Sequence, residues 1–209
     1  REELLDAENN NLSVFIMGHI SPGDPIVILV NNKIVEISQI YRVEARYRAI
    51  VDRFTNIIGG QFFGHTHNDQ FQVVRGYGED SSPVGVIFLA PSLSTYTELN
   101  PSFRVYEIDS ETNQIVDYKQ YRLNLTKWNE NTSGPIEWDL AYSFLEVIRY
   151  ETIKKVTLKK GYGLDNTSPE SVDALVERIK TDNATATTYI SNFNTGVERA
   201  YDISPRKNA

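Results

Sequence analysis

Apolar residues are distributed in two different patterns along the chain. Short apolar runs bounded by glycine, proline, asparagine or aspartate predict strands. These predicted strands cover residues 12–17, 61–63, 71–74, 84–89, 103–108 and 115–125. Apolar residues spaced by three and four positions predict helices instead. The predicted helices cover residues 1–8, 38–57, 138–155, 169–180 and 185–201, and Ser168-Pro169-Glu170 has the composition of a helix start.

The order of these elements predicts an α/β fold. Short turns join the strands that follow residue 70, which predicts antiparallel pairing and the second sheet of a two-sheet sandwich with outer helices. Residues 26–30 and 34–37 fit either a hairpin or a strand that leads into a helix. Residues 129–135 have the composition of a linker. We therefore predict a sheet domain over residues 1–128 and a helical subdomain over residues 129–209.

Composition narrows the classes of function. The 209 residues are 40% hydrophobic and carry a net charge of -7, which suits a globular protein and argues against a nucleic-acid-binding or anionic-membrane surface. No apolar stretch approaches the roughly 18 residues of a membrane span, so we expect no transmembrane segment. The chain has neither an initial methionine nor a signal peptide, which indicates that its first residue is not the natural start or follows processing.

Cysteine usage and glycosylation sequons give opposing indications of compartment. With no cysteine, the chain has no disulfide, thiolate ligand or cysteine nucleophile, which weakly favours a reducing compartment. Sequons modestly favour secretion. They begin at Asn11, Asn124, Asn131, Asn166 and Asn183.

The three histidines all lie beside predicted strand ends. Gly18-His19 follows one apolar run, and Gly64-His65-Thr66-His67 follows another. Residues i and i+2 of an extended segment point to the same side, so His65 and His67 could face one point. Neutral imidazole is the commonest ligand of transition metals, so His19, His65 and His67 are the predicted metal ligands. The alternative is that these histidines lie on an exposed loop and bind nothing.

The same residues resemble a known family. Gly64-His65-Thr66-His67 resembles the GHTH box of calcineurin-like metallophosphoesterases, and Gly18-His19 resembles their upstream GH box. The similarity runs from residue 1 to about Trp138 and is closest to the C-terminal half of acid sphingomyelinase and its phosphodiesterase relatives. The segments that carry it are Gly18–Gly23, Gln61–His67, Phe88–Ser92 and Asn100–Asp109.

The resemblance implies half of an αββα metallophosphoesterase sandwich with two divalent metal ions, zinc being favoured. His19 and His65 would bind one ion and His67 the other. The D-x-H, G-D and G-N-H boxes of the family are absent, so catalytic groups are expected in an N-terminal half of the same polypeptide and none in this chain. Asp24 and Asp69 are interpreted as loop or turn residues. The family's compartment is lysosomal or secreted, and substrate-binding residues are unknown.

Three functions remain open at this stage. The first is a metal-dependent phosphodiesterase of acid sphingomyelinase type, a partial site that would be inactive or very weak alone. The second is a phosphodiesterase of the same superfamily that acts on nucleotides or other small molecules. The apolar residues 26–30 slightly favour a lipid-like substrate, although burial of a strand explains them equally. The third is a non-catalytic module with one adventitious metal.

Overall fold

The computed structural model describes residues 1–23, 27–30, 33–37, 41–78, 81–130, 132–145 and 161–197, with the backbone alone for 27–30, 33–37 and 41–43. Its strands are β1 Val14–Met17, β2 Val27–Val30, β3 Lys33–Ile37, β4 Ile58–Phe63, β5 Gln70–Arg75, β6 Pro83–Leu89, β7 Ser102–Ile108, β8 Ile115–Arg122 and β9 Asp139–Ser143. Its helices are α1 Glu2–Asn9, α2 Tyr41–Arg53, α3 Leu125–Glu130, α4 Pro169–Thr181 and α5 Asn183–Phe193. The fold is mixed α/β, as the sequence predicts.

The first sheet has the strand order β1-β4-β6-β5. β1, β4 and β6 are parallel, and β5 runs antiparallel to β6. A parallel pair needs a long crossover, and α2 lies in the connection between β1 and β4. The parallel strands therefore end at one edge of the sheet, where both histidine motifs leave it.

A second sheet has the antiparallel order β7-β8-β9, and β2 and β3 form a separate hairpin. The prediction that every strand after residue 70 belongs to this second sheet was wrong, because β5 and β6 pair into the first sheet. β6 is buried along most of its length, as expected for a strand covered on both faces. Turn length alone does not reveal that a strand such as β6 also has a parallel neighbour.

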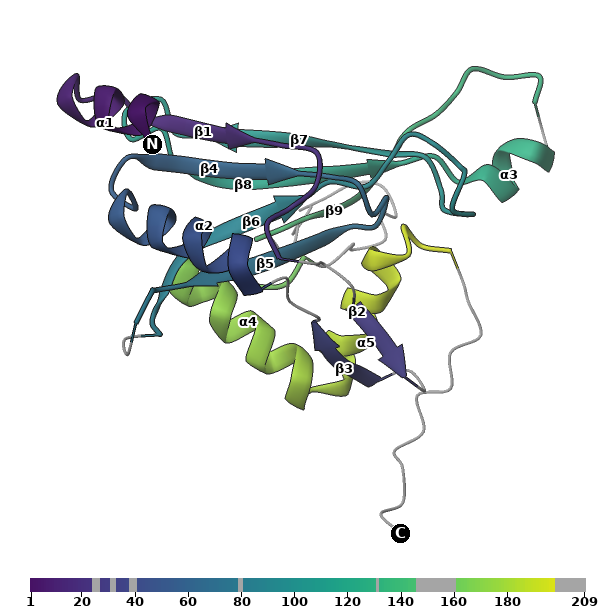
Figure 1. Cartoon of the computed structure of the whole chain (residues 1–209). Coiled ribbons are helices and arrows are strands. Elements are labelled where there is room, and N and C mark those ends of the chain that lie inside the picture. Colours follow the sequence, from purple (N-terminus) through teal and green to yellow (C-terminus); the bar gives the residue numbers. More distant parts are fainter. Residues whose placement is uncertain are drawn as a thin grey trace, which may run out of the picture.

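Figure 1 shows the layers of the fold, and two apolar cores hold these layers together. One lies between the first sheet and the helices α1 and α2, around Val51, Phe54 and Leu89. The larger core includes side chains from both sheets and from α4 and α5, among them Phe88 and Phe144. The two sheets are thus stacked. Helices α1 and α2 pack against the first sheet, and α4 and α5 contribute to the larger core.

The predicted start of one helix is confirmed by its cap. Ser168 caps α4, its hydroxyl accepting a hydrogen bond from Ser171 N at 3.3 Å. α1, α2 and α5 also match predicted helices, although α5 ends at Phe193. Within the predicted helix 138–155, residues 139–143 form the strand β9, which pairs with β8, and residues 146–155 lie outside the described residues. The helix prediction was wrong for residues 139–143, because a short apolar run does not distinguish a strand from a helix.

Strand β1 is apolar in sequence but is not fully buried. Phe15 and Met17 are 39% and 81% exposed, so this strand is only half buried. The predicted hairpin alternative at 26–37 is confirmed by β2 and β3. The boundary between residues 128 and 129 lies inside α3, and the division into two domains stays a prediction.

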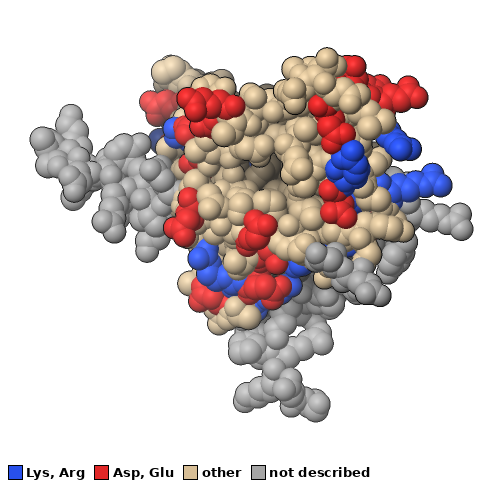
Figure 2. All heavy atoms as spheres, turned by 90° about the vertical axis from the view of Figure 1, so that its left-hand side faces the viewer, with Lys and Arg blue, Asp and Glu red and all other residues tan. Residues whose placement is uncertain are grey.

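Charge is mixed over the visible surface. Figure 2 shows acidic and basic side chains interspersed on the face that is at the left in Figure 1, with a hollow near the centre. Within the described ranges, none of the helices combines the length and the apolar character that crossing a membrane requires.

Candidate metal centre

The two histidine motifs leave the first sheet side by side. β1 and β4 are parallel, with Met17 opposite Phe62. The hydrogen-bond ladder continues beyond the strand ends, since Gly18 N donates to Phe62 O and Gly64 N donates to His19 O, both at 3.0 Å. Backbone pairing therefore brings His19 beside the start of the second motif.

Gly18 allows this close approach. A Cβ at Gly18 would lie 2.6 Å from Cε1 of the Phe63 ring, which is closer than atoms can pack. A Cβ at Gly64 would have only one contact, at 4.0 Å from His19 O. The first motif thus needs glycine for space, whereas the packing around the second motif leaves room for a side chain.

The segment around His65 and His67 is not extended. β4 ends at Phe63, and His65 and His67 have φ angles of 75° and 64°. These values lie in the left-handed region, which is uncommon for residues other than glycine. The prediction that extended backbone turns both imidazoles to one side was therefore wrong. Such a conformation persists where surrounding contacts hold it, and it is frequent at functional sites.

His19 and His65 lie in contact. Nε2 of His19 is 3.2 Å from Nδ1 of His65, and the ring centroids are 5.0 Å apart in an edge-to-face arrangement. Two nitrogen ligands at ~2.0–2.1 Å from a tetrahedral zinc ion lie roughly 3.3 Å from each other. Both rings are exposed. The observed spacing and the donor type therefore fit two ligands of one ion.

His67 has different surroundings. Its ring is partly buried, and its Nδ1 is buried without a hydrogen-bond partner among the described residues. An unpartnered buried nitrogen is free to bind a metal ion. The described residues include no group of three or more histidine, cysteine, aspartate or glutamate side chains placed to hold a metal. The structure thus brings two of the predicted ligands into contact and does not group the third with them.

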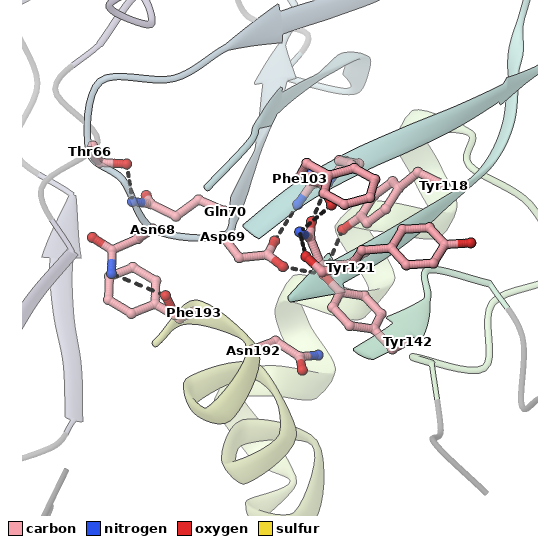
Figure 3. Close-up of polar contacts among 12 residues, drawn as sticks. Thr66, Asn68, Asp69, Gln70, Phe103, Tyr118, Tyr121, Tyr142, Asn192 and Phe193 are labelled. Atoms are coloured by element: carbon pink, nitrogen blue, oxygen red, sulfur yellow. Dashed lines mark hydrogen bonds and ion pairs between the residues drawn. The ribbon is translucent and has the colours of Figure 1, made fainter. Parts of the chain in front are cut away.

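The loop that carries these histidines is tied to α5 (Figure 3). The Asn68 side chain donates to Phe193 O at 3.1 Å, and Asp69 N donates to the same carbonyl oxygen at 3.3 Å. Within the loop, Gln70 Nε2 donates to Thr66 Oγ1 at 2.9 Å. The end of a helix more than a hundred residues later in the sequence therefore holds the histidine loop.

A buried ion pair ties the same loop to the second sheet. Arg104 Nη2 donates to Asp69 Oδ1 at 2.5 Å, and Tyr142 Oη donates to Asp69 Oδ2 at 2.7 Å. The side chains of Arg104 and Asp69 are 1% and 4% exposed. Figure 3 shows Asp69 directed toward Tyr142, away from the Asn68–Phe193 contact. The interpretation of Asp69 as a simple turn residue missed this pair. The sequence signal was an arginine between two apolar residues of a predicted strand, Phe103 and Val105.

Burial also controls protonation in this cluster. Burial raises the pKa of the Asp69 carboxyl, while the charge of Arg104 and the hydrogen bond from Tyr142 oppose the shift. Burial raises the pKa of Tyr142 well above its ordinary value, so its hydroxyl stays protonated and can donate. Asp24, the other aspartate considered from the sequence, lies outside the described residues.

Comparison with known proteins agrees with the motifs. No family model matches the chain. It is 36% identical to a sphingomyelin phosphodiesterase of Bos taurus over 86% of its length, and 35% identical to sphingomyelin phosphodiesterase A of Dictyostelium discoideum over 72%. A human cyclic GMP-AMP phosphodiesterase is 28% identical to the chain over 77% of the chain's length.

The chain spans 25%, 23% and 34% of these three relatives, in that order. The first two relatives are more than 30% identical to the chain over more than two thirds of its length. They confirm the resemblance that the motifs indicate. The chain therefore belongs to the acid sphingomyelinase-like family of phosphodiesterases.

Proposed function

We propose that the complete protein is a metal-dependent phosphodiester hydrolase of acid sphingomyelinase type, and that this chain supplies part of its metal site. The observation that carries the proposal is the 3.2 Å contact between His19 Nε2 and His65 Nδ1 at the ends of two parallel strands. The names of the relatives support phosphodiester hydrolysis. The fold supports it too, because ligand sites gather at the carboxyl ends of strands in such sheets.

In this proposal His19 and His65 hold one divalent ion, and His67 offers its free Nδ1 to the other. Zinc suits a set of imidazole ligands. Bound metal would supply a hydroxide nucleophile and stabilise charge on the phosphoryl oxygens. The residues of this chain fix the ligand positions, through the Gly64–His19 backbone bond and the anchored loop. None of them is proposed as a general acid or base.

The set of ligands in this chain is incomplete for two ions. Three imidazoles provide no negative charge, and two divalent ions need about eight coordination positions between them. The described residues place no carboxylate cluster at the site. We therefore propose that an N-terminal half of the same polypeptide supplies the carboxylates and the group that protonates the leaving oxygen. The relatives are about four times as long as the matched region. The chain alone should be inactive or very weak.

The substrate class has two candidates. Sphingomyelin, or a related lipid whose product resembles phosphocholine, follows from the names of the bovine and Dictyostelium relatives. A small nucleotide phosphodiester follows from the name of the human cyclic GMP-AMP phosphodiesterase. The apolar segment that slightly favoured a lipid, residues 26–30, has side chains outside the described residues.

A secreted or lysosomal location belongs to the same proposal. Four of the sequon asparagines, Asn11, Asn124, Asn166 and Asn183, are exposed, as attachment of a glycan requires. The fifth, Asn131, lies outside the described residues. Treatment of the natively expressed protein with a glycosidase would show whether they carry glycans.

The test uses the full-length protein. Zinc content and hydrolysis of sphingomyelin and of cyclic GMP-AMP should be measured for wild type, His65→Ala and His67→Ala. Each substitution removes one metal ligand, so we expect bound zinc to fall and activity to drop at least ~100-fold. That range corresponds to loss of roughly 3 kcal/mol of transition-state stabilisation.

Tyr77→Ala is the matched control, because this ring is 61% exposed and lies in the turn at the opposite end of β5. It should leave zinc content and activity unchanged. Activity that survives both histidine substitutions would remove the metal-dependent assignment. Zinc that binds without hydrolysis of either substrate would favour the non-catalytic module.

A further inference from the structure

The backbone conformation of the histidine loop needs external support. His65 and His67 both have left-handed φ angles, which a free loop would seldom adopt. Only Asn68 and Asp69 separate His67 from the start of β5. Whatever holds Asp69 therefore also limits where His67 lies.

The buried pair Asp69–Arg104 is well suited to this role. Both carboxylate oxygens of Asp69 are engaged, one by Arg104 and the other by Tyr142. Two acceptors in fixed directions determine the orientation of the carboxylate as well as its position. Asp69 is thus held by the second sheet, although its backbone leads into the first.

Arg104 is itself held from several sides. Its Nε donates to Gln120 Oε1 at 2.9 Å, and its Nη1 donates to Tyr106 Oη at 3.3 Å. Its guanidinium carbon lies 3.9 Å from the centroid of the Tyr118 ring, and Tyr118 Oη is 3.0 Å from Tyr142 Oη. A lysine could not make these planar, directed contacts.

General stability does not explain such a pair. Removing two charges from water is costly, and well-packed apolar side chains often stabilise a core equally well or better. Buried ion pairs of this kind can instead select one arrangement of the chain. Here the pair connects the loop bearing His65 and His67 to the second sheet.

We propose that Asp69 and Arg104 are positioning residues that hold the histidine loop in its ligand-binding conformation, with Tyr142 assisting. This inference rests on the proposed metal site. It assigns no contact with substrate to these residues, which act through His65 and His67. Outer contacts of metal ligands typically change metal affinity ~10–100-fold when they are removed.

The test compares Asp69→Asn and Arg104→Lys with Asp117→Asn in the full-length protein. Asp117 is a matched control, since it is a buried carboxylate that accepts from Leu145 N at 3.0 Å, from Tyr118 N at 2.7 Å and from the Ser143 hydroxyl. None of these three contacts is made to the histidine loop, and the one to Tyr118 is to its backbone. Zinc affinity is measured by competition with a chelator, well below the unfolding temperature of each variant.

A second readout needs no metal. The imidazole NMR signals of His19, His65 and His67, assigned by substitution, are recorded for each metal-free variant. We expect Asp69→Asn and Arg104→Lys to weaken zinc binding ~10–100-fold and to shift the His65 and His67 signals. Asp117→Asn should lower the unfolding temperature without either effect. Tyr142→Phe removes one hydrogen bond to Asp69 without removing a charge. It tests the same positioning role if the charge variants do not fold.

The outcomes separate the two proposals. Unchanged zinc affinity and unshifted imidazole signals in a folded variant, or equal effects in Asp117→Asn, would overturn the positioning role and leave the metal site intact. A wild-type protein that binds no zinc would overturn the proposed function. In that case shifted imidazole signals in Asp69→Asn alone would still support positioning of the loop.

Discussion

At the scale of single residues, close contacts explain why particular side chains occur at the histidine site. Gly18 faces the Phe63 ring, and Phe63 itself is 9% exposed and packs edge-to-face against Tyr47. The ring therefore has little room to move away from a larger residue at position 18. Gly64 occupies the equivalent place in the second motif without a comparable neighbour.

This difference predicts the effect of adding one methyl group. Gly18→Ala should destabilise the protein by about 1–3 kcal/mol, because a Cβ would overlap the Phe63 ring. Chemical denaturation measures the change. Gly64→Ala is the matched control and should have a smaller effect. Equal losses in both variants would show that the ring contact is not the cause.

At the scale of elements, a helix cap is a local sequence signal. Ser168 begins α4 as its composition predicts, whereas the cap of α5, Asp182, lies three residues before the predicted start at residue 185. Capping is local, since donor and acceptor lie within three residues of each other. Strand β9 gave the opposite result, because its pairing with β8 depends on residues about 20 positions away.

The Asp182 cap makes the stability of α5 depend on pH. Its carboxylate accepts from Thr185 Oγ1 at 2.6 Å and Thr185 N at 2.7 Å, and these bonds lower the pKa of Asp182 below its ordinary 3.8. A lowered folded-state pKa stabilises the fold above the unfolded-state pKa. That contribution is lost as pH falls through the folded-state value.

Asp182→Ala should accordingly lower the unfolding midpoint at pH 7. The difference from wild type should shrink below about pH 3.8, where the carboxyl of the unfolded chain is protonated. Thermal unfolding across this range measures both effects. Asp165→Ala removes another exposed carboxylate outside the helices and controls for net charge. A difference that stays constant with pH would contradict the cap.

At the scale of the whole molecule, the larger core joins parts that are distant in the sequence. Phe88 of the first sheet packs edge-to-face on Tyr118 of the second sheet and on Phe144, which directly follows β9. Val172, Leu175 and Ile179 of α4 enter the same cluster. The position of the second sheet, and with it that of Arg104, therefore depends on this core.

Leu175 tests the contribution of α4 to that core. It is 1% exposed, so Leu175→Ala should cost about 2–5 kcal/mol through lost burial and the cavity left behind. Denaturant unfolding measures the loss. Leu93→Ala, at a side chain that is 61% exposed, should change stability by less than about 0.5 kcal/mol. Similar losses for both leucines would mean that α4 contributes little to the core.

The local sequence determined which residues could serve the proposed metal site and where the capped helix α4 begins. His19, His65 and His67 follow strand ends, and this placement is visible from an apolar run that stops at a glycine. The family could be identified for the same reason, since its motifs are short and contiguous. Short apolar runs also marked most strands, although they identified neither the neighbours of each strand nor the burial of its two faces.

Only the tertiary structure decided which of these residues meet. His19 and His65 are 46 positions apart and touch because two parallel strands end together. Asp69 and Arg104 are 35 positions apart and pair because two sheets stack on one core. Contacts of this kind depend on strand order and packing. These contacts cannot be predicted from the residues that are adjacent in the sequence.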